Sequence, residues 1–236
     1  MRSAFKTWVC VLLAGAMTLA LAPPAGARKG KHHTDLTEIL LQMNEASKKL
    51  HTLSANLEYT KVTVLVDDKS TESGQLFFRK GKTSEICINF QKPENKILLL
   101  RKNKGEIYLP KISQIQDYDL AQKSDLLQQF LLLGFGTDTN ELKKNYDIKY
   151  LREEDLDDDT TVLLELTPRK ANVTAQISKI QMWVSEESWL PTRQEFFESG
   201  GDYLIANYSG VKVNRDLPGS AFELNAPANA KHVKMN

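Results

Sequence analysis

The chain has 236 residues, of which 41 % are hydrophobic and 26 % are charged, and its 31 basic residues nearly balance its 30 acidic ones. This balance excludes the strongly basic surface that nucleic-acid binding requires, so we expect no nucleic-acid partner. The length suits one domain, or at most two, and it is sufficient for a hydrophobic core.

The first 27 residues have the parts of an export signal in the usual order. Arg2 and Lys6 form a positive start, an uncharged apolar run covers residues 7–22, and a small-residue cleavage site ends at Ala27. The alternative is a membrane anchor, but the apolar run is short for one. We therefore predict that residues 1–27 are a signal peptide, cleaved after Ala27, and that the mature chain is exported.

A helix is predicted at about residues 35–51, after a flexible polar tail at residues 28–34. Asp35 is a suitable N-cap, and Glu38 follows at the spacing of a capping box. Apolar side chains then recur at the spacing of one helical face. These side chains belong to Leu36, Ile39, Leu40, Met43, Ala46 and Leu50.

From Thr52 onward, apolar and polar residues alternate, which is the pattern of a β-strand with one buried face. The alternation changes phase before Val62, so we expect a β-bulge near Thr60, with Val64 and Val66 continuing the strand. Short apolar segments separated by Gly, Pro and Asn turns follow at nearly regular spacing. This spacing indicates an antiparallel meander rather than parallel strands joined by helices.

A strongly apolar segment, DLLQQFLLLGFG, interrupts the meander at residues 125–136. It is too short to cross a bilayer and too apolar on all sides for an ordinary surface helix. Asp125 and Gly134 suit the two ends of a helix, and a second short helix is predicted from Asp138. Helices at about residues 123–145 are therefore available to cover the sheet.

Strands resume after this segment and alternate with turn signals. The acidic sequence EEDLDDD at residues 153–159 indicates a solvated hairpin turn, because its spacing matches no calcium loop, and Gly200-Gly201 indicates a tight hairpin. The count reaches about ten or eleven strands. We predict an α+β fold that is mostly β, with one strongly curved antiparallel sheet and a helical cover.

No motif of enzymatic or metal chemistry occurs in the sequence. It contains no G-x-S-x-G, no P-loop, no G-x-G-x-x-G, no H-E-x-x-H and no C-x-x-C. We therefore expect no catalysis, no cofactor and no metal. Cys87, the only cysteine after the signal peptide, is expected to be a small buried residue of a strand.

Two blocks of short segments follow one another in a distinctive order. Residues 74–119 contain the Gly-led GQLFFRKG, a strand ending in NFQKPEN, the aliphatic ILLL, a Gly turn and IYLPKISQIQDY. Residues 177–227 contain IQMWVSEESWLPTRQEFF, a Gly hairpin and a closing FELNAP. In order and spacing, these blocks resemble the LolA family of periplasmic lipoprotein carriers. The resemblance spans about residues 35–233.

The resemblance implies an unclosed β-barrel with a helical lid over an apolar cavity, in a single domain at residues 35–236. It implies that the cavity holds the acyl chains of a lipoprotein, since each methylene exposed to water costs about 0.8 kcal/mol. The cargo would pass from an inner-membrane donor complex to an outer-membrane acceptor, which places the carrier in the periplasm. We expect the carrier to be a monomer.

One alternating set of strand side chains is predicted to line the cavity, and the lid to close it. The strand set is Leu57, Tyr59, Leu76, Phe78, Ile86, Ile88, Phe90, Ile97, Leu99, Ile107 and Leu109. The lid set is Leu36, Ile39, Leu40, Met43, Leu126, Leu127, Phe130, Leu131, Leu133 and Phe135. Trp183 and Trp189 are expected at a rim of the cavity, where a ring is half wet.

In the LolA family an arginine ties the lid to the barrel. The matching stretch here is Arg79-Lys80-Gly81, and it lacks the proline that follows in the family, so the resemblance assigns a lid latch to Arg79 or Lys80. This departure leaves a different cargo open, such as a free glycolipid. The alternative function is a sensor or regulatory module of the same fold, which would read lipids or lipoproteins in envelope stress signalling.

Overall fold

The computed structural model of the chain describes residues 35–101, 104–119 and 133–235, and all of these described residues belong to one compact unit. Within the described residues, twelve strands form one sheet in the order β12-β6-β5-β4-β3-β2-β1-β11-β10-β9-β8-β7. The strands are β1 (Thr52–Thr63), β2 (Asp68–Arg79), β3 (Glu85–Lys92), β4 (Lys96–Arg101), β5 (Lys104–Leu109), β6 (Gln114–Asp119), β7 (Tyr146–Leu156), β8 (Asp159–Pro168), β9 (Ile177–Ser185), β10 (Pro191–Glu198), β11 (Tyr203–Val213) and β12 (Lys231–Met235). The predicted signal peptide and polar tail, at residues 1–27 and 28–34, lie outside the described residues.

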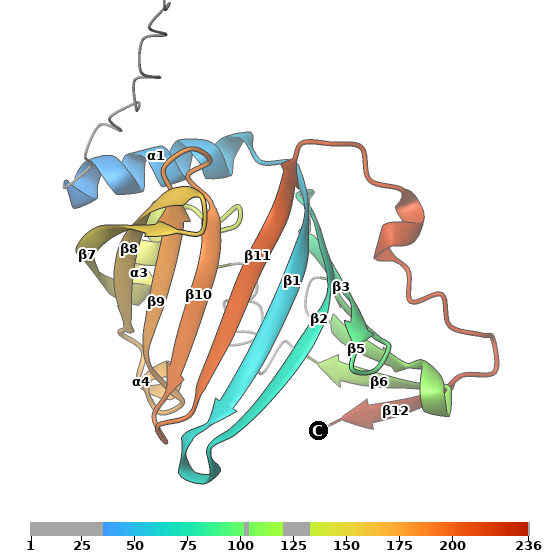
Figure 1. The fold of residues 1–236 in the computed structure, drawn as a ribbon. Coiled ribbons are helices and arrows are strands. Elements are labelled where there is room, and N and C mark those ends of the chain that lie inside the picture. The colour runs from blue at the N-terminus through green and yellow to red at the C-terminus, as the bar shows by residue number, and fades with distance from the viewer. Residues whose placement is uncertain (1–34, 102–103, 120–132, 236) are drawn as a thin grey trace, which may run out of the picture. The chain divides into compact units, whose positions relative to one another are not determined.

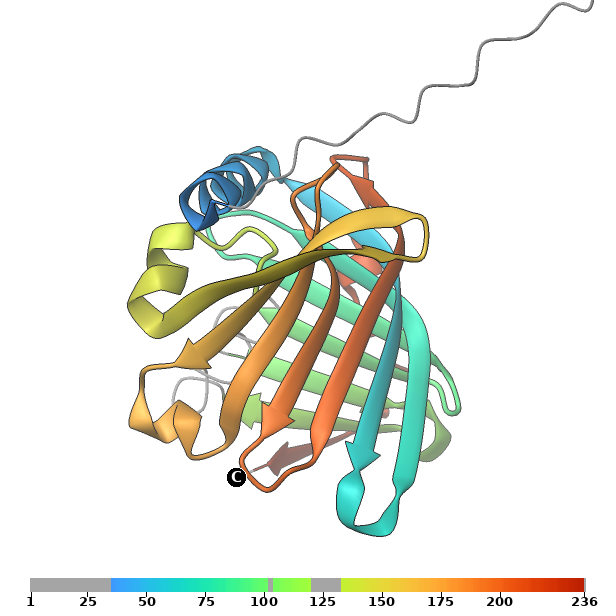
Figure 2. The same cartoon turned by 60° about the vertical axis from the view of Figure 1, so that its left-hand side comes forward.

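The sheet curls without closing, because its edge strands β7 and β12 each pair with one neighbour only (Figures 1 and 2). All neighbouring strands are antiparallel except β12, which runs parallel to β6. The predicted fold, a mostly β chain with a curved, unclosed antiparallel sheet, is therefore confirmed.

The strand count of ten or eleven was too low, because the sequence IYLPKISQIQDY forms two strands and not one. The chain reverses at a 3-10 turn, η2 (Pro110–Ile112), and continues as β6. Ser113 closes this turn with a left-handed backbone, at φ 47°. The left-handed residue of this turn is a serine and not the glycine that usually adopts this conformation, so the sequence marks the chain reversal only weakly.

The predicted first helix is confirmed as α1 (Leu36–Lys49). Asp35 caps it by accepting a hydrogen bond from the backbone N–H of Thr37, at 2.8 Å. Figure 1 shows α1 lying along one end of the sheet. Its periodic apolar side chains pack against strands of the sheet, which explains why the helical spacing was clear.

The bulge expected near Thr60 is wrong, since β1 and β2 pair without any shift from Thr52 to Thr63. The apolar residues that follow do not continue the strand. They form a 3-10 turn, η1 (Val64–Val66), which joins β1 to β2. The irregularity of β1 lies instead at its other end, opposite β11, between Ser54 and Asn56.

The second short helix is confirmed as α3 (Thr139–Asn145), with Asp138 as its N-cap. The apolar segment at residues 125–136, which we call the apolar insert, lies for its larger part, residues 125–132, outside the described residues. The hairpin turns predicted in EEDLDDD and at Gly200-Gly201 are confirmed, and a short helix, α4 (Ala171–Thr174), joins β8 to β9.

After β11 the chain crosses the outer face of the sheet as residues 214–230, which we call the outer strap (Figure 1). The strap contains the turn η3 (Gly219–Phe222), and Phe222 is fully buried against Cys87 and Leu99. Cys87 is thus confirmed as a buried strand residue. Burial raises the pKa of its thiol to about 11, against the opposite effect of Arg101, so the thiol is neutral at ordinary pH.

Replacing Phe222 by Ala is expected to lower the free energy of unfolding by about 3 to 5 kcal/mol, because a fully buried ring leaves a cavity. The control is Val213→Ala, at a position that is 42 % exposed, where we expect a change within roughly 0.5 kcal/mol. Urea unfolding followed by tryptophan fluorescence measures both. Equal losses for the two variants would contradict the role of the strap in the core.

Candidate functional site

The inner face of the sheet, defined as the side on which α1 and residues 133–136 pack, is the candidate site. Cross-strand partners share a face. Leu76 lies opposite Ile88, Ile88 opposite Leu98, and Leu98 opposite Ile107. One apolar row therefore crosses four strands, from β2 to β5.

Two clusters of buried apolar side chains occupy this face. One joins side chains of β1 to β4 and β11 with Phe135, and the other joins side chains of β7 to β10 with α1 and Leu133. The cover is uneven, because Leu98 and Ile107 remain partly exposed. The inner face is thus an apolar surface that the described residues cover only in part.

The structure places nine of the predicted lining residues on the inner face and two on the outer face. The two exceptions are Ile97 and Leu99, which pack under the outer strap. The turn after β3 resets the alternation, so that Leu98 and Leu100 take the inner positions of β4. The residues on the inner face are Leu57, Tyr59, Leu76, Phe78, Ile86, Ile88, Phe90, Ile107 and Leu109.

The predicted lid residues fall into two groups. Those on α1 are buried or half-buried in the cluster with β8 to β10, and those at the end of the apolar insert, Leu133 and Phe135, are buried on the inner face. The α1 residues are Leu36, Ile39, Leu40 and Met43. The remaining members lie outside the described residues, and they are Leu126, Leu127, Phe130 and Leu131.

A buried polar pair fixes the end of the apolar insert on the sheet. The side-chain amide of Gln194 donates to the backbone carbonyl of Leu133 at 2.7 Å, and its oxygen accepts from the hydroxyl of Tyr208 at 2.8 Å. The ring of Phe135 packs edge-on against Tyr208, with 4.9 Å between centroids. Burial raises the pKa of Tyr208, and the nearby Tyr59 adds to the rise, so the phenol remains a donor. Sequence reasoning missed Gln194, because a glutamine in a strand gives no sign of its partner.

Two glycines let the same segment approach the sheet. Gly134 has φ +83°, and a Cβ there would lie 2.4 Å from Cγ of Pro191. Gly136 has φ +69°, and a Cβ there would lie 3.1 Å from the ring of Phe78. The GFG sequence is therefore needed for close contact with the inner face as well as for the turn.

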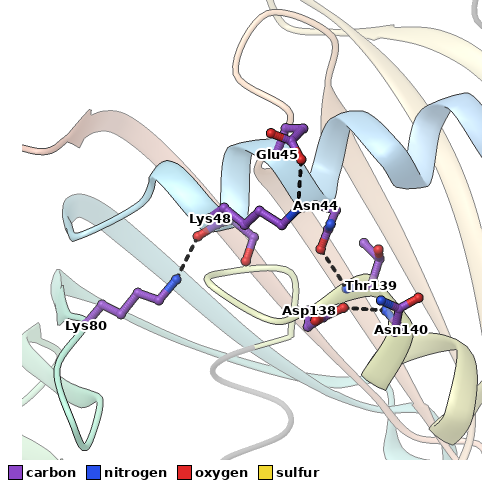
Figure 3. A network of polar contacts seen from close by, with 8 residues as sticks. Asn44, Glu45, Lys48, Lys80, Asp138, Thr139 and Asn140 are labelled. Atoms are coloured by element: carbon purple, nitrogen blue, oxygen red, sulfur yellow. Dashed lines mark hydrogen bonds and ion pairs between the residues drawn. The ribbon is translucent and has the colours of Figure 1, made fainter.

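The two candidates for a lid latch make different contacts. The ammonium of Lys80 donates to the carbonyl of Ser47 at 3.1 Å, in the last turn of α1 (Figure 3). Arg79 points to the outer face, where it pairs with Glu85 and lies over the ring of Phe222 at 4.3 Å. Of the two, only Lys80 therefore links the sheet to a helix of the predicted lid.

A second contact ties α1 to α3. Figure 3 shows Asn44 of α1 beside the start of α3, where its side-chain oxygen accepts from the backbone N–H of Thr139 at 3.4 Å. The carboxylate of Asp138 caps α3 through the N–H of Asn140, at 2.7 Å. The helical cover is thus joined to itself as well as to the sheet.

The inner face has a polar end, which lies at the β1–β2 hairpin and away from α1. Glu72 and Lys96 form an ion pair there at 2.7 Å, and the ammonium also lies 4.7 Å from the ring centroid of Phe90. Burial raises the pKa of Tyr59 to about 12, and the carboxylates of Glu72 and Glu198 act in the same direction. The face therefore runs from an apolar middle to an end that carries charge.

The two tryptophans do not share a rim. Trp183 lies on the outer face, where its indole N–H donates to Glu154 and Arg193 lies 5.1 Å from the ring. Trp189, in the turn after β9, packs against the inner cluster. The expected position at the rim of the cavity is thus wrong for Trp183, because its side chain projects from β9 to the outer face of the sheet.

A cleft of about 670 Å³ lies on the outer side, between the β7–β8 turn and strands β10 and β11. Its lining includes the acidic side chains of Asp157, Asp158 and Glu187. In the part of the chain that the structure describes, no three His, Cys, Asp or Glu side chains are grouped to hold a metal ion.

Residues 83–224 match a protein family that is described as "Uncharacterized protein". The chain belongs to this family. No curated protein matches the chain in sequence. Among the described residues of this family member, no helix combines the length and the apolar character that a membrane span needs.

Several solved structures are similar to this family member. An uncharacterized conserved protein from Thermus thermophilus is 11 % identical, with a TM-score of 0.56, and the match covers 85 % of this chain and 100 % of that one. MucB is 12 % identical, with a TM-score of 0.53, over 84 % of this chain and 65 % of MucB. A LolA superfamily protein from Nitrosomonas europaea is 19 % identical, with a TM-score of 0.39, over 79 % of this chain and 96 % of that one.

These identities are low, so the likeness shows the fold alone. The curved, unclosed sheet is the fold that the sequence resemblance implies, and it is shared with the Thermus thermophilus protein and with MucB. The chain spans about two thirds of the length of MucB.

Replacing Gly134 by Ala is expected to cost about 1 to 3 kcal/mol in the free energy of unfolding, because the left-handed backbone and the contact with Pro191 both oppose a side chain. Gly200→Ala is the matched control, since no atom lies within 4 Å of its added Cβ. Chemical denaturation compares them. A neutral Gly134→Ala would contradict the tight seating of this segment.

The raised pKa of Tyr59 predicts a loss of stability at high pH. Folding favours the neutral phenol, so the stabilisation is complete below the unfolded pKa of about 10. It is lost as the pH rises through the folded pKa of about 12. Phenolate absorbance of the wild type and Tyr59→Phe tests this, since the variant should lack one late-titrating phenol. Loss of a phenol with an ordinary pKa instead would overturn the assignment.

Proposed function

We propose that the chain is a periplasmic carrier that shields the acyl chains of lipoproteins, or of a related lipid, on the inner face of its sheet during transfer from inner to outer membrane. The observation that carries the proposal is the continuous apolar row across β2 to β5, with Leu98 and Ile107 still partly exposed. The export signal predicted at residues 1–27 supports the periplasmic location.

The physics of acyl chains favours such a surface. Burial of each methylene stabilises a bound chain by about 0.8 kcal/mol, so a long apolar row binds a chain without specific polar contacts. Ligand sites of this kind are concave and mostly apolar, with few polar groups. The Glu72–Lys96 pair at the polar end suits the headgroup side of such a ligand.

We propose further that the protein acts without catalysis. In two polar pairs of the inner face, Gln194 with Tyr208 and Glu72 with Lys96, the partners are engaged with each other. Neither pair has the nucleophile and base that covalent catalysis requires. The carrier would work as a monomer, between an inner-membrane donor complex and an outer-membrane acceptor.

A second candidate is a sensor or regulatory module that binds lipid and signals to a protein partner. The likeness to MucB favours it, because solved structures include MucB in complex with MucA. A carrier should move labelled lipoprotein or lipid between two membranes, whereas a sensor should bind lipid without moving it and should bind a partner.

Mass spectrometry of lipid extracted from the purified native protein tests the common part of both candidates. We expect an amphiphile with acyl chains, bound in near-stoichiometric amount. If no amphiphile is extracted and an apolar dye finds no site, the inner face is a closed core and the proposal fails.

Replacing Leu98 by Asn is expected to weaken acyl-chain binding about tenfold, because it removes apolar contact from the inner face. Ile97→Asn is the matched control, since Ile97 is also half-buried but faces outward. Displacement of an apolar fluorescent dye measures binding, and a melting curve measures folding. Equal loss of binding in both variants would contradict the assignment of the site to the inner face.

A further inference from the structure

The turn that joins β1 to β2 presents three adjacent aliphatic side chains to solvent. Val64 is 54 % exposed, Leu65 is 93 % exposed and Val66 is 68 % exposed. A single exposed aliphatic residue is ordinary, but three in succession at the end of a hairpin are not. We call this turn the apolar tip.

The apolar tip is held in place by polar contacts of its backbone. The N–H of Val64 donates to the carboxylate of Asp202, in the neighbouring β10–β11 turn, at 3.0 Å. The N–H of Asp67 donates to the carbonyl of Val64 at 3.2 Å, and Asp67 has a left-handed backbone at φ 48°. These contacts order the backbone and leave the aliphatic side chains pointing outward.

A second turn repeats this design at the same end of the sheet. In η2, the N–H of Ser113 donates to the carbonyl of Pro110 at 3.1 Å, and Ile112 is 60 % exposed. The β1–β2 and β5–β6 hairpins are alternate hairpins of one antiparallel meander, so their turns lie at one end, and Figure 1 shows the β1–β2 turn opposite α1. Two exposed aliphatic points therefore occur where the inner face has its polar end.

Charged side chains follow the apolar tip on both strands. Lys61 and Lys69 are exposed, as are Asp67 and Asp68, so this collar has two charges of each sign. An apolar tip above a charged collar matches the boundary of a bilayer, where aliphatic groups enter the acyl region and charges remain among the headgroups. With the carboxylate of Asp202 beside Val64, the surroundings of the tip have no excess of positive charge, so they give no preference for anionic lipid.

The size and shape of the apolar tip favour a lipid surface over a protein partner. A specific protein interface buries about 1,000 Å² or more, and three side chains on a convex turn offer much less. A bilayer needs no matching groove, because its acyl chains adapt to a projecting side chain. The tip therefore fits a fluid apolar surface better than a shaped one.

We propose that the end of the sheet with the apolar tip contacts the lipid bilayer surface, with Leu65 inserted among the lipids and Ile112 as a second contact point. The direction of cargo exchange rests on the proposed function: acyl chains would pass between the bilayer and the inner face at this end, beside Glu72 and Lys96. The bilayer contact itself does not require that function.

Vesicle flotation of the chain from Arg28 onward, which contains the whole compact unit, tests the contact. The probe is phosphatidylcholine vesicles, and the variant is Leu65→Asp. We expect vesicle binding to fall about tenfold or more, because a leucine leaves the acyl region and a charge replaces it. Leu65 makes little contact with the fold, so the melting temperature should be unchanged.

Leu41→Asp is the matched control, because Leu41 is a 57 % exposed leucine on α1, at the other end of the sheet. It should bind vesicles as the wild type does. Leu65→Ser serves as a second variant if Leu65→Asp folds poorly, and it should also weaken vesicle binding.

Three results would overturn the proposal: a wild type that does not bind vesicles, a Leu65→Asp variant that binds them fully, or equal losses at positions 41 and 65. Loss of self-association in Leu65→Asp, without any vesicle binding, would assign the tip to a second copy of the chain. Dye binding to the inner face is measured on the same variants and should not change. If the dye never binds while vesicle binding depends on Leu65, the proposed function fails and the bilayer contact stands.

Discussion

Cross-strand partners in an antiparallel sheet point to the same side, and the rest of this structure depends on that constraint. It aligns Leu76, Ile88 and Leu98 in one apolar row on the inner side. On the outer side it brings Cys87 beside Leu99, where Phe222 of the strap covers both. A large antiparallel sheet curls, and this one does not close, so each face needs a cover from elsewhere in the chain.

The two covers are built differently. The outer strap places a fully buried phenylalanine on a small cluster, and the strand that follows it, β12, pairs with β6. The inner cover relies on α1 and on residues 133–136, where the side chain of Gln194 donates a hydrogen bond to the backbone carbonyl of Leu133. Because side chains of β4 and β5 remain partly exposed, the inner cover is incomplete among the described residues. This difference explains why the inner face, and not the outer one, is the candidate site.

Much of the fold could be predicted because its signals are local. Helical spacing and an Asp cap define α1, and glycine marks the hairpin at residues 200–201. The pattern of short segments predicted a curved sheet, and the resemblance to the LolA family implied the unclosed barrel. The faces of β4 could not be predicted, since the alternation restarts after the turn and both Ile97 and Leu98 are apolar.

Other features depend on contacts between distant residues, which leave no mark in a local pattern. The parallel pairing of β12 with β6 joins segments more than a hundred residues apart. Gln194 gains its role from Leu133 and Tyr208. The valines of η1 looked like strand residues, because composition alone does not show that Asp67 adopts a left-handed backbone and reverses the chain.

Photo-crosslinking tests the central claim most directly, with a fatty acid that carries a diazirine on its acyl chain. Peptide mapping by mass spectrometry should place the adducts on inner-face segments of β2 to β5, including Leu98 and Ile107. Adducts confined to outer-face residues such as Ile97, or an absence of saturable labelling, would contradict an acyl-chain site on the inner face.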